Sequence, residues 1–492
     1  ASVEELTEQI SELAAGAHLP TDPDALESEL ERLESGLVPY GLHVFGQPFS
    51  EDERFAMVCG LLSCGLADQP PAVELWAAAN DIEDIAELSA TARMELEGQV
   101  QELIGRALRQ PELSTTELTS DEPLAQLIER GRQIANSWAS NDEWAGLHAA
   151  LNGQHLPSKL GGDMMRSPEV LPAGTNIHQF DPHAIPTSMA MRRGEQIAES
   201  IRQAHRQAND GAELRCAGII LWGIEATRTQ GESYAQILAL LGVRISGRAR
   251  PGRNRWEVIP AAELSAPRVD VVVTISGFFR DLFGNLIEEL DDIINALAEL
   301  DEPEEINPIA ARTRKLRAEF EASGMGVDEA AELAKIRIFG PSPGRYGPGL
   351  TATIDSGQWD DSADLSAGFI AGSEFAYTRR RYGQRIAGLF GSNLEDIEAV
   401  CQIRSNNEYQ ITDLDHFFEF LGGMSNAAKH LSGRQIPTLV SDTTGRKVHT
   451  GSSADSARAG LYTRLLNPAW TEAMLSHGHR GVSEINDRTT NL

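Results

Sequence analysis

Three side chains that could bind a metal ion or accept a proton lie close together in one polar stretch. His178, Asp181 and His183 fall within six residues. Imidazole and carboxylate groups at this spacing could bind a divalent metal, which makes His178 and His183 candidate ligands and His178 and Asp181 candidate catalytic groups. A structural role is the alternative, because Asp181-Pro182 is typical of a turn and the imidazoles could bond to the backbone. Asn176, just before them, is a candidate substrate-binding residue.

A second pair of polar side chains follows a predicted strand that ends at Trp222. Glu225 and Arg228 lie in the polar loop expected over residues 223–232. Glu225 could exchange a proton with a substrate, and Arg228 could bind an acidic substituent. The two side chains could equally form an ion pair with each other.

A third group follows the strand predicted over residues 269–275. Ser276 and Arg280 come directly after this strand and are candidate substrate-binding residues. Arg280 could hold a carboxylate through two parallel hydrogen bonds. A local ion pair with Asp281 or Glu288 is the alternative.

Two further polar stretches lie later in the chain. Arg345 and Tyr346 stand in a loop over residues 340–349 whose glycines and prolines do not fit a packed core, and both are candidate substrate-binding residues. A predicted helix start carries several acidic residues and a histidine, and we interpret it as a solvated, capped helix terminus. Its members are Asp413, Asp415, His416 and Glu419.

The sequence predicts an α/β fold for the elements that must position these side chains. Residues 269–275 are nearly all β-branched, which predicts a strand buried on both faces of a parallel sheet. Residues 216–222 predict a second strand, and each strand is followed by a polar segment and a helix. This alternation predicts a doubly wound domain, in which ligands bind beyond the carboxyl ends of the strands.

The periodicity of the apolar residues changes along the chain. Residues 1–155 read as a helical region, 156–360 as an α/β domain with a loop-built cleft, and 361–492 as a mixed, mainly helical carboxyl-terminal region. Within the last region, residues 394–400 are predicted to form a helix.

Composition excludes several classes of partner. The chain has 42 basic and 73 acidic residues and a formal net charge of -31, which argues against nucleic acid and anionic membrane surfaces. No apolar run reaches the length of a membrane span. Four scattered cysteines fit a reducing cytoplasm better than a disulfide framework.

Common catalytic motifs are missing from the sequence. There is no Walker loop, no dinucleotide fingerprint, no His-Glu-x-x-His helix, no Cys-x-x-Cys pair and no Gly-x-Ser-x-Gly elbow. ATP hydrolysis by a Walker loop, and the usual protease and hydrolase mechanisms, therefore have no support.

Several motifs nevertheless resemble, in order, one known family over nearly the whole chain. They include Arg337-Ile-Phe-Gly340 and Gly344-Arg-Tyr-Gly-Pro-Gly349, together with residues 36–46, 176–187, 221–222, 227–232, 269–270, 275–281, 422–424 and 466–470 and Asp413. The chain resembles the carboxyl-terminal part of the large, tetrapyrrole-binding subunit of ATP-dependent chelatases, a family that contains the CobN subunit of cobaltochelatase and the H subunit of magnesium chelatase.

The resemblance implies insertion of a divalent metal into a tetrapyrrole ring, with ATP hydrolysed on separate AAA+ ATPase subunits. Such a reaction needs a base near the ring and groups that strip water from the metal. The stretches at 276–281, 300–303 and 337–349 are closer to the cobalt branch, which implies Co²⁺ and cobalamin biosynthesis. Ile177-His178 is closer to the magnesium branch, so Mg²⁺ stays the alternative.

Two departures from the family pattern limit the resemblance. Pro172-Ala-Gly-Thr-Asn176 stands where the family usually has Pro-Thr-Gly-Arg-Asn, so an arginine is lost. The family's His-Gly-x-x-Glu-x-x-Pro-Gly-Lys stretch does not occur, and its place would precede Ala1. We therefore expect a carboxyl-terminal portion or one half of a split subunit, inactive alone. A docking module for the ATPase subunits, without a ring site, is the alternative from a different functional class.

Overall fold

The computed structural model describes residues 3–17, 19–23, 25–26, 29–30, 33, 44–66, 69–82, 85, 88–161, 164, 167–175, 178–179, 181–246, 254–406, 409–414, 416–445 and 447–491. The chain forms two compact units. The helical unit comprises His43–Asp181 and Thr227–Gln230, and the sheet unit comprises Ala1–Leu42, Pro182–Ala226 and Gly231–Leu492. Most of the motif at 36–46 lies outside the described residues.

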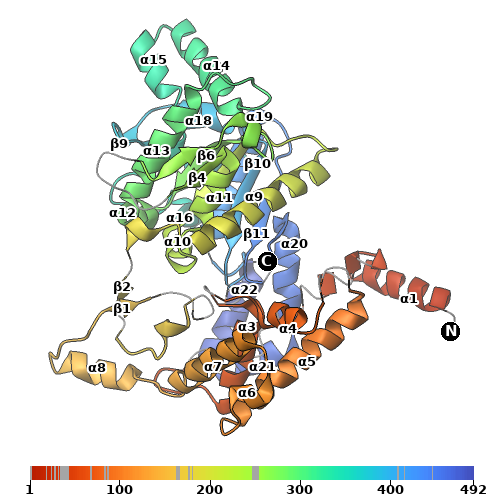
Figure 1. The fold of residues 1–492 in the computed structure, drawn as a ribbon. Helices are drawn as coiled ribbons and strands as arrows, with labels where there is room; N and C mark the ends of the chain where they lie inside the picture. Colours follow the sequence, from red (N-terminus) through yellow and green to blue (C-terminus); the bar gives the residue numbers. More distant parts are fainter. Residues whose placement is uncertain are drawn as a thin grey trace. The chain divides into compact units, whose positions relative to one another are not determined.

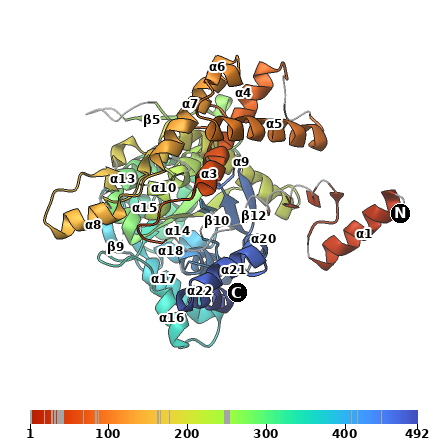
Figure 2. The same cartoon turned by 90° about the horizontal axis from the view of Figure 1, so that it is seen from below.

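The helical unit is built from α3 (Glu51–Cys64), α4 (Ala72–Ala79), α5 (Ala90–Arg109), α6 (Thr115–Leu118), α7 (Glu122–Ser137) and α8 (Glu143–Leu151). Helices α3, α5 and α7 lie side by side (Figure 2) and share a core that includes Val58, Ile104 and Leu127. Ser50 and Glu53 form a capping box that fixes the start of α3. This confirms the helical reading of the amino-terminal region.

Two short strands and a single helical turn complete the helical unit. Strands β1 (Lys159–Leu160) and β2 (His178–Gln179) pair in parallel, and η2 (Pro168–Val170) lies between them in the sequence. The indole of Trp138 donates a hydrogen bond to the carbonyl oxygen of Pro168 (3.0 Å), so the end of α7 anchors this segment.

The sheet unit is centred on an eight-stranded sheet in the order β12-β11-β10-β3-β6-β7-β8-β9. Its five central strands are parallel, and β12, β8 and β9 run antiparallel to their neighbours. The strands are β3 (Cys216–Leu221), β6 (Asp270–Ile275), β7 (Ile338–Gly340), β8 (Phe375–Tyr377), β9 (Tyr382–Arg385), β10 (Ala399–Arg404), β11 (Thr438–Asp442) and β12 (His449–Ser452). The predicted doubly wound α/β class is confirmed (Figure 1).

Helices cover both faces of this sheet. On one face α9 (Ser188–Ala208) contacts β11 and β12, and α11 (Glu232–Leu241) contacts β3 and β6. On the other face α14 (Pro308–Ala322), α17 (Ser362–Ser373) and α19 (Gly423–Ser432) contact β6, β7 and β10 in turn. Every residue of β3, β6 and β10 is buried, which explains why these strands are mainly apolar.

The remaining elements belong to the sheet unit, except for the last two residues of α10, which belong to the helical unit. They are α1 (Val3–Gly16), η3 (Pro182–Ala184), α10 (Gly223–Arg228), β4 (Val243–Ile245), β5 (Trp256–Val258), η4 (Ala261–Glu263), α12 (Gly277–Leu282), α13 (Gly284–Ala298), α15 (Val327–Leu333), α16 (Leu350–Ser356), α18 (Leu389–Leu394), η5 (Phe417–Gly422), α20 (Ser453–Gly460), η6 (Leu461–Leu465), α21 (Pro468–Ser476) and α22 (His479–Asn491). No helix in the described part of the chain is long and apolar enough to cross a membrane.

Two local predictions were wrong. The helix predicted over 394–400 is instead the end of α18, a short connection and the start of β10, because burial between two neighbouring strands favours the extended form of these residues. The polar loop predicted over 223–232 begins with α10, a short helix that directly follows β3.

Candidate functional site

The loops that follow β3, β6 and β7 meet at one end of the sheet, which we call the carboxyl edge. Ser276 begins this arrangement, because its hydroxyl accepts hydrogen bonds from the backbone N–H groups of Phe279 (3.1 Å) and Gly223 (3.3 Å). One side chain therefore caps α12 and ties it to the first residue of α10. Ser276 is almost fully buried, so its role here is to position the two loops.

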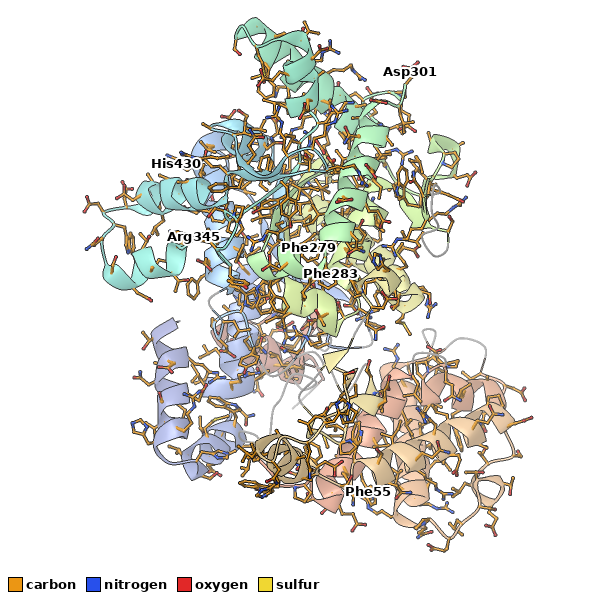
Figure 3. All side chains as sticks on the ribbon, turned by 90° about the vertical axis from the view of Figure 1, so that its left-hand side faces the viewer. Phe55, Phe279, Phe283, Asp301, Arg345 and His430 are labelled. Carbon is orange, nitrogen blue, oxygen red and sulfur yellow. The ribbon has the colours of Figure 1, made fainter. Side chains whose placement is uncertain are left out.

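The loop after β7 is held against the start of α12. The N–H of Gly277 donates to the carbonyl oxygen of Tyr346 (2.9 Å). A Cβ at Gly277 would lie 2.4 Å from the carbonyl oxygen of Arg345, so only glycine allows the backbones to approach this closely. Figure 3 shows Phe279, Phe283 and Arg345 in the same part of the sheet unit.

Arg280 fastens the same loop. Its guanidinium donates to the carbonyl oxygens of Ser342 (3.1 Å) and Arg345 (3.0 Å) and to the carboxylate of Asp281 (2.8 Å). Burial opposes the charge of Arg280, but the hydrogen bond to Asp281 contributes to a net rise in its pKa. The local pair with Asp281 thus forms, and Arg280 acts on the loop that carries Arg345 and Tyr346. Its predicted contact with substrate stays a prediction.

Three apolar side chains at these loops remain exposed to solvent. Ile224 of α10 is 44% exposed, Phe278 of α12 is 38% exposed and Tyr346 is 62% exposed. Gly223 and Phe278 are in close contact, since a Cβ at Gly223 would lie 2.5 Å from the ring of Phe278. Exposed apolar side chains gathered on joined loops are typical of a binding surface.

Buried polar groups lie on the same loops or contact residues next to them. Glu225 of α10 is only 4% exposed. Glu419 of η5 is also buried, and it accepts a hydrogen bond from the N–H of Gly349 (2.9 Å) at the end of the 340–349 loop. The imidazole of His416 stacks on the indole of Trp222, with ring centroids 3.7 Å apart and an interplanar angle of 6°. The carboxyl edge therefore combines carboxylates and an imidazole with apolar side chains.

This burial corrects the interpretation of the acidic stretch at 413–419. We expected a solvated helix terminus, whereas the carboxylate of Asp413 is buried and forms ion pairs with Arg464 (3.2 Å) and Arg488 (3.3 Å). No local pattern could indicate these pairs, because both arginines come from the last helices of the chain. Asp415 lies outside the described residues.

The next two strand ends are also held by charge. Arg404 at the end of β10 forms an ion pair with Asp442 at the end of β11. Burial alone would raise the pKa of Asp442, but Arg404 and hydrogen bonds with Thr444 outweigh it and lower the pKa. Arg193 of α9 donates to the carbonyl oxygen of Thr443 (2.9 Å), which fixes the connection after β11.

The candidates from the 176–187 stretch are less well defined. Asn176 and the side chain of His178 lie outside the described residues, and Asp181 is exposed at the end of the first segment of the helical unit. His183 is exposed in the sheet unit, where its carbonyl oxygen accepts a hydrogen bond from Arg255 (3.1 Å). Among the side chains that the structure describes, no group of three or more His, Cys, Asp or Glu could hold a metal ion. The metal-binding role of His178 and His183 stays a prediction.

Arg228 is the last residue of α10 and is partly buried. It therefore lies at a helix terminus and not in the loop that was predicted there. Sequence reasoning did not select Trp222, and it interpreted His416 and Glu419 as part of a solvated terminus. Trp222 stands at the end of a predicted strand, which is the one signal that could have identified it.

The mostly parallel sheet, covered by helices and with loops joined at its carboxyl edge, defines an α/β protein. A sequence profile of the CobN/Magnesium Chelatase family matches residues 2–492. The chain belongs to this family.

Known relatives from both branches match the chain. It is 33% identical to the aerobic cobaltochelatase subunit CobN of Pseudomonas aeruginosa, over 96% of this chain and 40% of that protein. It is 29% identical to the chloroplastic magnesium-chelatase subunit ChlH of Oryza sativa subsp. indica, over 94% of this chain and 36% of that protein. The chain thus spans about two fifths of the length of these relatives.

A solved structure extends the likeness to the fold. The catalytic subunit of cobaltochelatase from Mycobacterium tuberculosis superimposes with a TM-score of 0.85 at 27% sequence identity. The match covers 99% of this chain and 43% of that one. The fold described above is therefore shared by this part of the family.

Proposed function

We propose that the chain is a portion of the large subunit of an ATP-dependent chelatase and forms part of its tetrapyrrole-binding surface at the carboxyl edge. The observation that carries this proposal is the set of exposed apolar side chains, Ile224, Phe278 and Tyr346, on loops joined to one another beside buried carboxylates. A flat macrocycle offers apolar faces to such side chains.

Metal insertion requires that two protons leave the ring nitrogens while the incoming metal loses water. Glu225 is the proposed proton acceptor, because it is buried next to the apolar surface in the helix that follows β3. His416 and Glu419 are the alternative acceptors at the same edge. His178, Asp181 and His183 are proposed to meet the metal ion before it enters the ring.

Arg228 and Arg345 are proposed to meet acidic substituents of the ring, and Asn176 to donate a hydrogen bond to the substrate. Ser276 and Arg280 are proposed to act mainly by positioning, since each bonds to the loops that would contact the ring. The ATP-dependent step is assigned to AAA+ partner subunits, because the chain carries no Walker loop.

Cobalt is the preferred metal and a cobalamin precursor the preferred substrate. The higher identity to a cobaltochelatase subunit, 33% against 29% for the magnesium-chelatase relative, supports this choice. Magnesium insertion into a porphyrin is the second candidate, favoured by Ile177-His178.

The test is a titration of a metal-free corrinoid precursor and of a porphyrin with the 492-residue chain, followed by the absorption bands of the ring. We expect a band shift and saturable binding. Ile224→Ser should weaken this binding about tenfold to a hundredfold, because an isoleucine side chain loses about 1.5–3 kcal/mol of apolar burial. Val327→Ser is the matched control, because Val327 is 57% exposed on α15 at the opposite end of the sheet unit (Figure 1).

A lack of any band shift with either ring would refute the binding role. Retention of an AAA+ chelatase subunit on the immobilised chain, without ring binding, would instead identify a docking module. Equal loss of affinity in both serine variants would show that the ring does not bind specifically at the carboxyl edge.

A further inference from the structure

A cavity of about 540 Å³ opens in the helical unit among residues of α3, α5 and α7. Three arginines line it, together with two glutamates and Phe55. These charged residues are Arg54, Arg109, Arg132, Glu51 and Glu129. The chain as a whole has 73 acidic against 42 basic residues, so a cavity with more arginines than acids is unlike the average surface.

Part of this arrangement has a structural explanation. Arg54 donates to the carbonyl oxygen of Ala135 near the end of α7 (3.0 Å). Arg132 donates to the carbonyl oxygens of Ala107 (2.9 Å) and Gln110 (3.2 Å) at the end of α5. Carbonyl groups in the last turn of a helix lack hydrogen-bond donors within the helix, and these arginine side chains provide the donors.

Other donors in the cavity have no such partner. The Nε of Arg54 is buried and has no hydrogen-bond partner among the described residues. Arg109 is exposed at the end of α5 and forms no hydrogen bond with another residue that the structure describes, and its NH1 would be 3.2 Å from a Cβ at Gly105. The donors of Arg109 can therefore bind an acceptor without first breaking a hydrogen bond to a described residue.

Phe55 brings two of the guanidinium groups together. The guanidinium carbons of Arg54 and Arg109 lie 5.8 and 5.9 Å from the centroid of its ring. Phe55 is 9% exposed and belongs to the core of the helical unit, where Figure 3 labels it. Cation–π attraction to a fixed ring limits the positions of both arginines, so less freedom is lost when an anion binds between them.

We propose that this cavity binds a small organic anion, with a carboxylate or phosphate group held by Arg54, Arg109 and Arg132. The volume is that of a small-molecule site. Planar guanidinium groups form charge-assisted hydrogen bonds with either oxyanion. Glu51 and Glu129 lower the net charge of the cavity, so a ligand with one or two negative charges fits better than a polyanion. The cavity belongs to the helical unit and is built from other residues than the carboxyl edge, so the proposal does not depend on tetrapyrrole binding.

The experiment measures the thermal unfolding of the 492-residue chain with inorganic phosphate, adenosine monophosphate or succinate, at equal ionic strength maintained with sodium chloride. We expect at least one probe to raise the unfolding temperature in a saturable way. Binding of phosphate and the nucleotide alone would identify a phosphate ligand, and binding of succinate alone a carboxylate ligand. Both results support the proposal.

Arg109→Gln is the decisive variant, and Arg106→Gln, exposed on the same helix outside the cavity, is its control. Arg109→Gln should weaken binding about tenfold to a hundredfold, as expected for loss of a charge-assisted hydrogen bond, while Arg106→Gln should bind like the parent chain. Arg109→Lys keeps the charge and should lie between them.

No stabilisation by any probe would overturn the proposal, as would equal binding by Arg109→Gln and Arg106→Gln. Without a probe, Arg109→Gln should unfold at the same temperature as Arg106→Gln or slightly below it, because the only described contact it loses is the cation–π contact with Phe55. Arg109→Lys provides the same comparison if the glutamine variant does not fold.

Discussion

Replacement of Gly277 by alanine tests whether the 340–349 loop packs against α12. A Cβ at Gly277 would lie 2.4 Å from the carbonyl oxygen of Arg345 and 2.6 Å from the Cα of Tyr346, whereas ordinary contacts begin near 3.4 Å. The loop would therefore have to move by about 1 Å, which strains the hydrogen bond between the Gly277 N–H and the Tyr346 carbonyl oxygen. Both contacts involve backbone atoms, so a side-chain rotation cannot relieve the clash.

The expected cost follows from these contacts. Overpacking of this kind costs about 1–3 kcal/mol, and a weakened hydrogen bond adds about 1 kcal/mol. The replacement of glycine by alanine in a helix recovers about 0.5–1 kcal/mol. We therefore expect Gly277→Ala to lower the free energy of unfolding by about 1–3 kcal/mol and to weaken ring binding through displacement of Tyr346.

Urea unfolding and the absorption titration measure the two effects. Gly284→Ala is the control, because a Cβ at Gly284, the first residue of α13, would have no atom within 4 Å. This variant should be neutral or stabilised by up to about 1 kcal/mol. Equal stability and equal ring binding of the two variants would refute the packing described here.

Two further predictions concern buried charge. Asp270→Asn should lower the free energy of unfolding by about 3–5 kcal/mol, because it leaves the buried Arg312 and Arg337 without their shared carboxylate. Asp396→Asn, at a partly exposed partner of Arg312, should cost about 1 kcal/mol or less, and equal urea midpoints for the two variants would contradict this. Burial lowers the pKa of His205 below its ordinary value of 6.5, so His205 binds a proton more readily in the unfolded chain than in the folded chain. Stability should fall as the pH drops below about 6.5, and His205→Gln should reduce this loss in urea midpoints measured at about pH 7.5 and 5.5; an unchanged pH slope would speak against it.

The central strands and many helix starts could be predicted from sequence because their signals are local. The continuous β-branched run of β6 predicts a strand buried on both faces, and the side chain of Thr187 caps α9 through the N–H of Ala190, a role for which threonine before a helix is a known signal. Parallel strands end at the same edge, so the loops carrying Arg280 and Arg345 were expected to lie together. Their direct contact confirms that expectation.

Other features depend on residues far apart in the chain. The short apolar run that becomes β10 fits a helix pattern as well as a strand pattern. Only its pairing with β3 and β11 decides in favour of the strand. The stacking of His416 on Trp222 and the burial of Asp413 likewise need partners about 50 or more positions away. A single sequence contains no local signal for such contacts.

The position of β3 has a consequence for biosynthesis. Its backbone pairs on one side with β6 and on the other with β10, where Ala217 faces Ala399. During translation β10 leaves the ribosome roughly 180 residues after β3. The middle of the sheet therefore keeps an open edge until late in synthesis. A nascent chain halted before residue 399 would present that edge to other chains, and we expect it to need a chaperone or to aggregate.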